Sequence, residues 1–253
     1  MSSRGNTTYL AIIEYDGTQY SGWHVQPGRR TVQAEVTTAL KRLFGKPSAI
    51  TVTGRTDAGV HARAQAVSFQ AARQIPPSNV QRALNRYLPP DISVTRVRVM
   101  PQGFNARRHA LKKTYEYHIW NRHYRSVWQG QNAWHIKVPL EISLMRKAAR
   151  KLTGSHDFSA FDAKNSALKD KVARLLSIQI NSRGGAVTIT FTGTRFLYKM
   201  VRNMVGTLVD VGTGKTKPED VAVILGSKKR ALAGQTAPAH GLFLKKIYFT
   251  HEK

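Results

Sequence analysis

The order of strand-like and helix-like patterns in the first hundred residues constrains the fold of this chain more than any other feature. A strand is expected where apolar residues are continuous or alternate, and a helix where they recur every three or four residues. The patterns predict, in order, a strand over 9–15, a helix over 32–43, strands over 49–53 and 64–70, a helix over 80–88 and a strand over 92–100. The first helix follows a possible N-cap at Thr31 and can end at Gly45. This β-α-β-β-α-β order is the ferredoxin-like pattern.

The second half repeats that order with additions. The patterns predict a strand over 111–120, a helix over 142–152, a hairpin of 172–180 with 187–191 around Gly184 and Gly185, a helix near 197–208 and a strand over 242–249. A further strand near Trp134 and a further helix after Pro218 are expected in this half. We therefore predict an α/β (α+β) fold of two ferredoxin-like halves with mainly antiparallel sheets, residues 1–104 and 105–253.

The last long helix of the second half is expected to carry two stripes. Leu197, Val201, Met204 and Leu208 recur at helical spacing and predict a buried apolar stripe. Three basic residues fall beside it at positions i, i+4 and i+7: Arg195, Lys199 and Arg202. This spacing predicts a basic stripe on one face of the helix.

Net charge is the feature of the composition that best indicates the kind of partner. The 253 residues include 40 Lys plus Arg against 14 Asp plus Glu, a formal net charge of +26. Such an excess attracts polyanions and releases their counterions on binding, so nucleic acid is the favoured partner. A basic surface without a ligand is the alternative. Because the chain has no cysteine, disulfides, thiolate metal sites and thiol nucleophiles are excluded.

No apolar run approaches the ~20 residues that a membrane span requires. The first residues also lack the apolar core of a signal peptide. We therefore expect a cytoplasmic protein. The nine histidines include no pair at zinc-ligand spacing, so we expect no metal site.

The segment from Gly54 to Ala62 places one carboxylate, Asp57, in a turn bracketed by Gly54 and Gly59. Glycines permit a tight turn and a close approach of a ligand to the backbone. Arg55 stands two residues before the aspartate and can pair with it. An ionised aspartate in a basic cleft can act as a nucleophile or a general base. On local chemistry alone, an ordinary turn containing an aspartate is at least as good an interpretation.

The segment from Gly54 to Ala62 resembles the signature of the TruA family of tRNA pseudouridine synthases. Seven further blocks of the chain resemble the same family in the same order. They are Glu14–Thr18 with Ser21–Trp23, Thr31–Gln33, Ala83–Asn85 with Leu88–Pro89, Phe104–Arg107, Tyr115–Tyr117, Met200–Gly206 and Ala237–Leu242. His24 departs from the glutamine expected there, outside the signature.

The resemblance implies that uridine is isomerised to pseudouridine in the anticodon stem-loop of tRNA, at about positions 38, 39 and 40, by base flipping. It also implies a pseudouridine-synthase fold with an active-site cleft between the two halves. The partners implied are tRNA and a second copy of the chain in a homodimer. Neither a metal nor an organic cofactor is implied.

Site residues are carried over by the same resemblance. Asp57 matches the family's nucleophile, which attacks either C1′ of the ribose or C6 of the base. Arg55 and Arg202 match two arginines near it, and Tyr115 matches a tyrosine that stacks on the flipped uracil and can take the C5 proton. We expect further RNA contacts from Arg107, Arg108 and Lys199, and assign Tyr117 to the core.

Two alternatives remain at the level of sequence. A noncatalytic RNA-binding protein on the same scaffold would use the same charge and aromatic residues, since RNA is held by phosphate contacts and stacking. Such a protein would not need the aspartate turn together with Tyr115 and Arg202. A pseudouridine synthase acting on another RNA would carry the same fold and the same Asp57.

Overall fold

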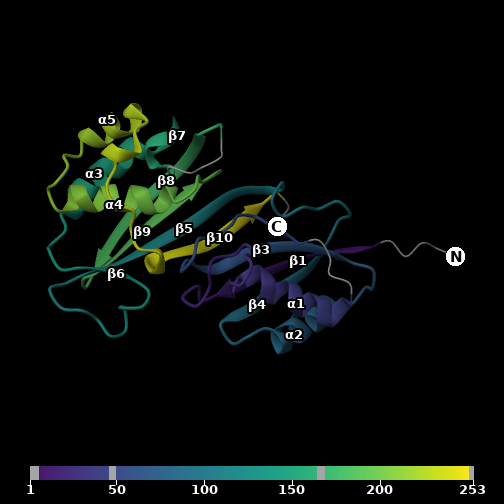
Figure 1. Cartoon of the computed structure of the whole chain (residues 1–253). Helices are drawn as coiled ribbons and strands as arrows, with labels where there is room; N and C mark the ends of the chain where they lie inside the picture. The colour runs from purple at the N-terminus through teal and green to yellow at the C-terminus, as the bar shows by residue number, and fades with distance from the viewer. Residues whose placement is uncertain (1–5, 46–49, 164–168, 251–253) are drawn as a thin grey trace. The chain divides into compact units, whose positions relative to one another are not determined.

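A computed structural model describes residues 6–45, 50–163 and 169–250 of this protein (Figure 1). The chain divides into two compact units. The first unit comprises Met1–Leu111 with Leu244–Lys253, and the second comprises Lys112–Phe243. Each unit is an α/β arrangement in which most strand pairs are antiparallel, as the patterns in the sequence predicted. No helix in the described part of the chain is long and apolar enough to span a membrane.

The first unit follows the predicted β-α-β-β-α-β order. Its elements are β1 (Thr7–Tyr15), α1 (Val32–Phe44), β2 (Thr51–Val52), β3 (His61–Ala71), α2 (Pro77–Tyr87) and β4 (Ile92–Met100), joined by most of β10 (Leu242–Phe249). Strands pair in the order β4-β1-β3-β10, and β2 also pairs with β3. The fourth strand has the predicted bounds, whereas β2 is shorter than expected. Ala49, where that strand was predicted to begin, lies outside the described residues.

The two helices of this unit lie on one face of its sheet (Figure 1). Phe44 at the end of α1 packs against Tyr9 and Phe69, whose ring centroids lie 6.0 and 5.9 Å away. Tyr9 and Phe69 are directly opposite each other in the β1–β3 register. Because side chains alternate along a strand, the neighbouring pair Thr8 and Gln70 belongs to the opposite face.

Helix α1 begins after Thr31 and ends at Gly45, the two cap residues that the sequence indicates. Gly45 takes a left-handed φ of 82° and its N–H donates to the carbonyl of Lys41, which ends the helix. The side chain of Thr31 makes no capping hydrogen bond. Thr31 is nevertheless the N-cap residue, as predicted, and its hydroxyl is buried without a partner among the described residues.

The second unit contains β5 (Ala110–Asn121), β6 (Trp134–Ile136), α3 (Ile142–Leu152), β7 (Gly154–Asp157), β8 (Val172–Arg183), β9 (Ala186–Gly193), α4 (Met200–Gly212) and α5 (Asp220–Ser227). Short 3₁₀ turns η1 (Ser159–Phe161), η2 (Arg230–Leu232) and η3 (Ala239–Gly241) complete it. Its strands pair in the order β5-β9-β8-β7, and β6 pairs in parallel with β5. The predicted hairpin is present, with Gly184 and Gly185 in left-handed conformations at its turn.

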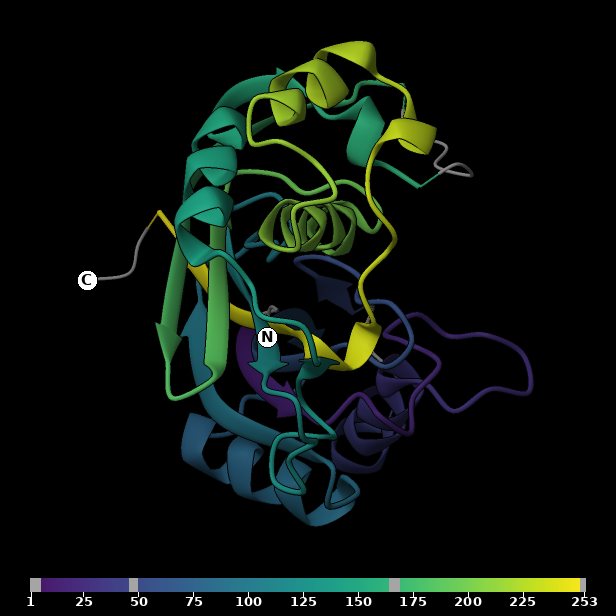
Figure 2. The same ribbon diagram turned by 90° about the vertical axis from the view of Figure 1, so that its left-hand side faces the viewer.

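Helix α4 forms the centre of the second unit (Figure 2), and its start differs from the prediction. It begins at Met200, so Arg195 and Lys199 precede it. Lys199 adopts a left-handed φ of 58°, which breaks the helical spacing. Arg195 turns away to pair with Asp170. The predicted basic stripe of Arg195, Lys199 and Arg202 on one helix is therefore wrong.

Candidate active site

Asp57 lies in the loop that connects β2 to β3 in the first unit, and hydrogen bonds on both sides hold this loop. On the side before Asp57, Gln65 donates from Nε2 to the carbonyl of Gly54 at 2.8 Å. Thr56 and Tyr15 share a buried hydrogen bond of 2.7 Å between their hydroxyl oxygens. On the side after Asp57, the N–H of Gly59 donates to the carbonyl of Tyr20 at 3.2 Å. The aspartate therefore stands on a backbone that neighbouring strands and turns hold in place.

The glycines around this loop have the conformations and close contacts that only glycine tolerates. Gly59 has a left-handed φ of 75°. Gly22 has a φ of 92°, and a Cβ there would stand 2.7 Å from the carbonyl oxygen of Thr56. A Cβ on Gly17 would stand 2.1 Å from the carbonyl oxygen of Val60. The segment over 17–22 therefore packs backbone to backbone against the Asp57 loop.

Exposure differs sharply among the residues of the loop. Asp57 is half-buried, whereas Thr56 before it is buried and Arg55 is exposed. Burial raises the pKa of Tyr15 to about 12, although its hydrogen bonds to Thr56 and Gln65 oppose the shift. The Tyr15 hydroxyl thus stays protonated over the working range of an enzyme and can donate or accept a hydrogen bond beside the loop.

In the second unit, β5 presents two tyrosines on one face. Tyr115 is 8% exposed and its ring meets the edge of Phe196, with centroids 4.9 Å apart. Tyr117 is fully buried and donates from its hydroxyl to the carbonyl of Pro238 at 2.8 Å. Burial raises the pKa of Tyr117, with the charge of Arg202 acting in the opposite direction. The assignment of Tyr117 to the core is confirmed.

Arg202 lies in the first turn of α4 and is half-buried. Its Nε donates to the carbonyl oxygen of Ala237 at 2.7 Å, and the N–H of Ala237 donates back to the carbonyl of Arg202 at 3.1 Å. This reciprocal pair fixes the stem of the arginine against residues 230–238, which we call the strap. Figure 2 shows the strap as the yellow segment that runs beside α4.

The strap is itself attached to α4 by a polar network. Arg230 donates from Nη2 to Asn203 Oδ1 at 2.9 Å and to Thr236 Oγ1 at 3.0 Å. Thr236 donates to the same Asn203 oxygen at 2.6 Å. A Cβ on Gly206 would lie 1.7 Å from the carbonyl oxygen of Gln235, so helix and strap touch backbone to backbone. Sequence reasoning missed this network, because Lys228, Lys229 and Arg230 resemble an ordinary basic surface cluster.

The remaining predicted RNA contacts lie at accessible positions. Arg107 and Arg108 are exposed, and Asn105 Oδ1 accepts both of their backbone N–H groups, at 3.0 and 3.1 Å. Lys199 is half-buried, with its ammonium 5.1 Å from the ring centroid of the exposed Tyr198. Asp57, Arg55, Arg107 and Arg108 therefore belong to the first unit, and Tyr115, Lys199 and Arg202 to the second.

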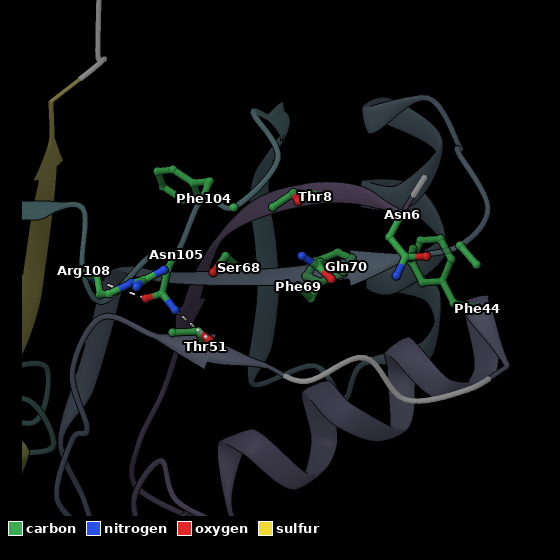
Figure 3. Close-up of a pocket in the computed structure, with 13 residues that line it drawn as sticks. Asn6, Thr8, Phe44, Thr51, Ser68, Phe69, Gln70, Phe104, Asn105 and Arg108 are labelled. Carbon is green, nitrogen blue, oxygen red and sulfur yellow. Dashed lines mark hydrogen bonds between the residues drawn. The ribbon is translucent and has the colours of Figure 1, made fainter. Parts of the chain in front are cut away.

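Groups of three or more histidine and acidic side chains able to hold a metal ion are not found in the described ranges. The first unit contains a hollow of about 550 Å³ on its sheet, which we call the trough (Figure 3). Its wall includes Arg108 and Asn105 but not Asp57.

Comparison with known proteins shows which protein family this chain resembles. Residues 11–107 and 148–250 match the family model described as tRNA pseudouridine synthase. A relative from Shouchella clausii (strain KSM-K16), "tRNA pseudouridine synthase A", is 44% identical over 236 residues, covering 93% of this chain and 90% of the relative. Proteins of the same name from Pelobacter propionicus (strain DSM 2379 / NBRC 103807 / OttBd1) and Bacillus subtilis (strain 168) are 43% and 40% identical. They cover 96% and 94% of this chain, and 99% and 97% of their own lengths.

Among solved structures, the "Crystal Structure of a Cbf5-Nop10-Gar1 Complex" aligns with a TM-score of 0.39 and 11% identity, over 93% of this chain and 57% of that chain. The family match and the curated relatives define an RNA-modifying isomerase. The chain belongs to the tRNA pseudouridine synthase family. The resemblance found in the sequence is thereby confirmed, and the noncatalytic alternative is set aside.

Proposed function

We propose that this enzyme isomerises uridine to pseudouridine in the anticodon stem-loop of tRNA, at about positions 38, 39 and 40, and that Asp57 is its nucleophile. One observation supports this most. Asp57 is the half-buried carboxylate of a loop held on both sides by hydrogen bonds and by glycine contacts. A nucleophile must be accessible to substrate while its backbone stays fixed, and this loop satisfies both conditions.

The reaction moves bonds without adding or removing atoms. The bond between C1′ and N1 of the uridine breaks, and a bond between C1′ and C5 forms after the base has rotated. The C5 proton leaves and N1 becomes protonated, so no oxidant, reductant or external group is consumed. Asp57 attacks C1′ of the ribose or C6 of the base, and either route forms a covalent intermediate that a carboxylate can later release.

The other predicted residues take the roles that the family resemblance assigns. Tyr115 stacks on the flipped uracil and accepts the C5 proton. Arg202 provides a positive charge near the reacting carboxylate. Arg55 is exposed, which favours the part of its role that displaces the target base from its stack. Arg107, Arg108 and Lys199 contact the RNA backbone, consistent with the net charge of +26. We also propose that the enzyme acts as a homodimer.

Mapping of pseudouridine tests the reaction, the substrate and the nucleophile together. Total tRNA and rRNA from cells that lack the enzyme are treated with the wild-type protein or with Asp57→Asn. The proposal predicts new pseudouridine at about positions 38, 39 and 40 of tRNA with the wild type, and none with the variant. Modification of rRNA, or of tRNA outside the anticodon stem-loop, would show that the enzyme has a different RNA target. Modification by Asp57→Asn would remove the aspartate from the mechanism.

A further inference from the structure

The polar floor of the trough belongs to the sheet face opposite to α1 and α2, and Phe44 at the end of α1 and Phe69 also line the hollow. The β1–β3 register pairs Thr8 with Gln70 and Leu10 with Ser68, and Ser68 also lies opposite Thr51 of β2. Thr8, Thr51, Ser68 and Gln70 line the trough, whose volume is about 550 Å³ (Figure 3). This volume suits a ligand of nucleotide size, because small-molecule sites usually measure about 300 to 1,000 Å³.

The loop after β4 forms the second wall of the trough and is attached to the floor. The N–H of Ala106 donates to Ser68 Oγ at 3.0 Å in a buried hydrogen bond. Asn105 holds the backbone of Arg108 through its side-chain oxygen, at 3.1 Å, and its amide nitrogen lies 3.5 Å from Thr51 Oγ1. Figure 3 shows Arg108 and Asn105 at one end of the trough and Phe104 above its floor. The wall is therefore formed before any ligand arrives.

A buried hydroxyl in the trough has no partner within the described ranges. Thr8 is 2% exposed, and its Oγ1 makes no hydrogen bond there. That oxygen has almost no accessible surface, so the polar side chains that the trough offers to a ligand are those of Gln70, Asn105 and Arg108. The lining residues also include no carboxylate in the part of the chain that the structure describes, whereas they include the cation of Arg108. The lining of the trough therefore suits a ligand in which an anionic group is attached to a polar ring.

The trough and the Asp57 loop lie at different positions along β3. Ser68 follows His61, the first residue of β3, by seven residues, so the two positions lie about 23 Å apart at the usual rise of a strand. A uridine held at Asp57 does not reach the trough. A nucleotide bound there is a different one.

We propose that the trough binds one unpaired nucleotide of the RNA substrate, other than the uridine that is modified. Its phosphate pairs with Arg108, its base lies against Phe104, and the amides of Gln70 and Asn105 contact the base edge. Sheet faces that helices leave uncovered are used in this way by RNA-binding modules, which hold splayed bases with aromatic and polar side chains. The inference rests on the proposed function, because it takes the bound nucleotide from the same RNA.

Two adjacent arginines provide a matched pair for the test. Arg107 and Arg108 are both exposed and both anchored by Asn105, but only Arg108 lines the trough. The full-length protein is titrated with unmodified tRNA at several salt concentrations. Arg108→Ala is expected to weaken tRNA binding about tenfold and to reduce the salt dependence by about one phosphate contact. Arg107→Ala removes the same charge at a proposed backbone contact outside the trough, and should weaken binding less, by about twofold.

Gln70→Leu tests recognition of the base without a change in charge. It is expected to weaken tRNA binding about threefold at an unchanged salt dependence, since it removes a hydrogen-bonding group and no phosphate contact. Equal effects of Arg107→Ala and Arg108→Ala would overturn the site, and an unchanged affinity of Gln70→Leu would overturn its contact with the base. Unfolding midpoints of the three variants show whether each is folded.

A free nucleotide is the other source of the same chemistry. Uridine and adenosine monophosphate are added as competitors of tRNA and as ligands alone. Binding of a free mononucleotide that depends on Arg108, together with unchanged tRNA affinity in Arg108→Ala, would contradict the assignment to RNA. Pseudouridine formation by the wild type is measured in parallel, so that failure of the trough proposal is distinguished from failure of the proposed reaction.

Discussion

Arg202 Nε donates a hydrogen bond of 2.7 Å to the carbonyl oxygen of Ala237, so the strap, and not only α4, sets the position of this arginine. The strap is in turn attached to Asn203 of the same helix through Arg230 and Thr236. Helix and strap thus form a closed set of contacts around the start of α4. Any role of Arg202 in catalysis then depends on Arg230, which lies far from it in the sequence.

Replacement of Arg230 by Met should lower kcat through Arg202. We expect a fall of about tenfold with KM within twofold, because the substrate contacts remain while the strap shifts. A double-mutant cycle separates this effect from general destabilisation. In an Arg202→Ala background, Arg230→Met should cause little further loss of kcat. Equal losses in both backgrounds would contradict a positioning role, and Thr236→Val, which removes only a hydroxyl, should reproduce a smaller part of the effect.

Tyr15→Phe should loosen the loop that carries Asp57. The variant leaves the Thr56 hydroxyl without its 2.7 Å partner, which costs about 1–2 kcal/mol of folding free energy. We expect kcat to fall about tenfold and tRNA affinity to stay unchanged, since Thr56 adjoins the proposed nucleophile. Single-turnover rates and tRNA titrations measure the two quantities. A variant with the wild-type rate would show that the hydrogen bond does not position the aspartate.

The same variant has a predictable effect on stability at high pH. Folding raises the pKa of Tyr15 to about 12, above the ordinary tyrosine value near 10. Tyr15 therefore contributes its full share of the free energy of unfolding below pH 10. That share is lost between pH 10 and 12, because there the tyrosine of the unfolded chain ionises first. Tyr20 and Tyr117 also have raised pKa values and contribute to the same decline. Tyr15→Phe should therefore lose stability less steeply than the wild type in this window, as measured by urea unfolding. Parallel curves would contradict the shift.

Gly22 and Gly28 form a matched pair for the close contact at the Asp57 loop. Both have left-handed φ values, 92° and 67°, so alanine strains the backbone at either position. A Cβ at Gly22 meets the carbonyl of Thr56 at 2.7 Å, whereas a Cβ at Gly28 meets nothing within 4 Å. Gly22→Ala should lower kcat by at least about tenfold, and Gly28→Ala should only destabilise by about 1 kcal/mol. Equal activity in the two variants would indicate that the contact is not needed for catalysis.

Lys199 and Lys228 share a left-handed φ of 58°, which is unfavourable for a residue with a Cβ. Replacement by glycine should raise the free energy of unfolding by up to about 1 kcal/mol at Lys199. The gain should be smaller at Lys228, because glycine there also removes the 2.8 Å ion pair with Asp157. Only Lys199→Gly should also weaken tRNA binding, by about threefold, because Lys199 is the predicted RNA contact. Filter binding and urea unfolding measure the two effects. Loss of affinity in both variants would assign the change to overall charge.

Periodicity in the sequence was enough to predict most elements, because their apolar stripes are buried as expected. The bounds of β4 and the turn of the β8–β9 hairpin agree with the patterns. The start of α4 could not be predicted, since Leu197 continues the apolar spacing but the left-handed Lys199 interrupts the helix. A single backbone conformation of this kind leaves no periodic signal.

Only those parts of the candidate site that belong to a local sequence motif could be predicted. Asp57 and its glycines stand together in the sequence, and the structure adds the Tyr15 and Gly22 contacts that hold them. The attachment of Arg202 could not be inferred, because Ala237 contributes a backbone carbonyl and any residue type offers one. Arg230 belongs to a run of basic residues, and charge alone does not distinguish a half-buried side chain that anchors the strap from a solvated one.

The release of tritium from tRNA labelled at C5 of uridine tests the central role of Asp57 most directly, because the C5 proton must leave whichever atom the aspartate attacks. Wild-type protein and Asp57→Asn are compared in single turnover, with tRNA affinity measured in the same buffer. We predict that Asp57→Asn binds tRNA within about twofold of the wild type and releases tritium at least about 10⁴-fold more slowly. Release at a rate near that of the wild type would contradict Asp57 as the nucleophile.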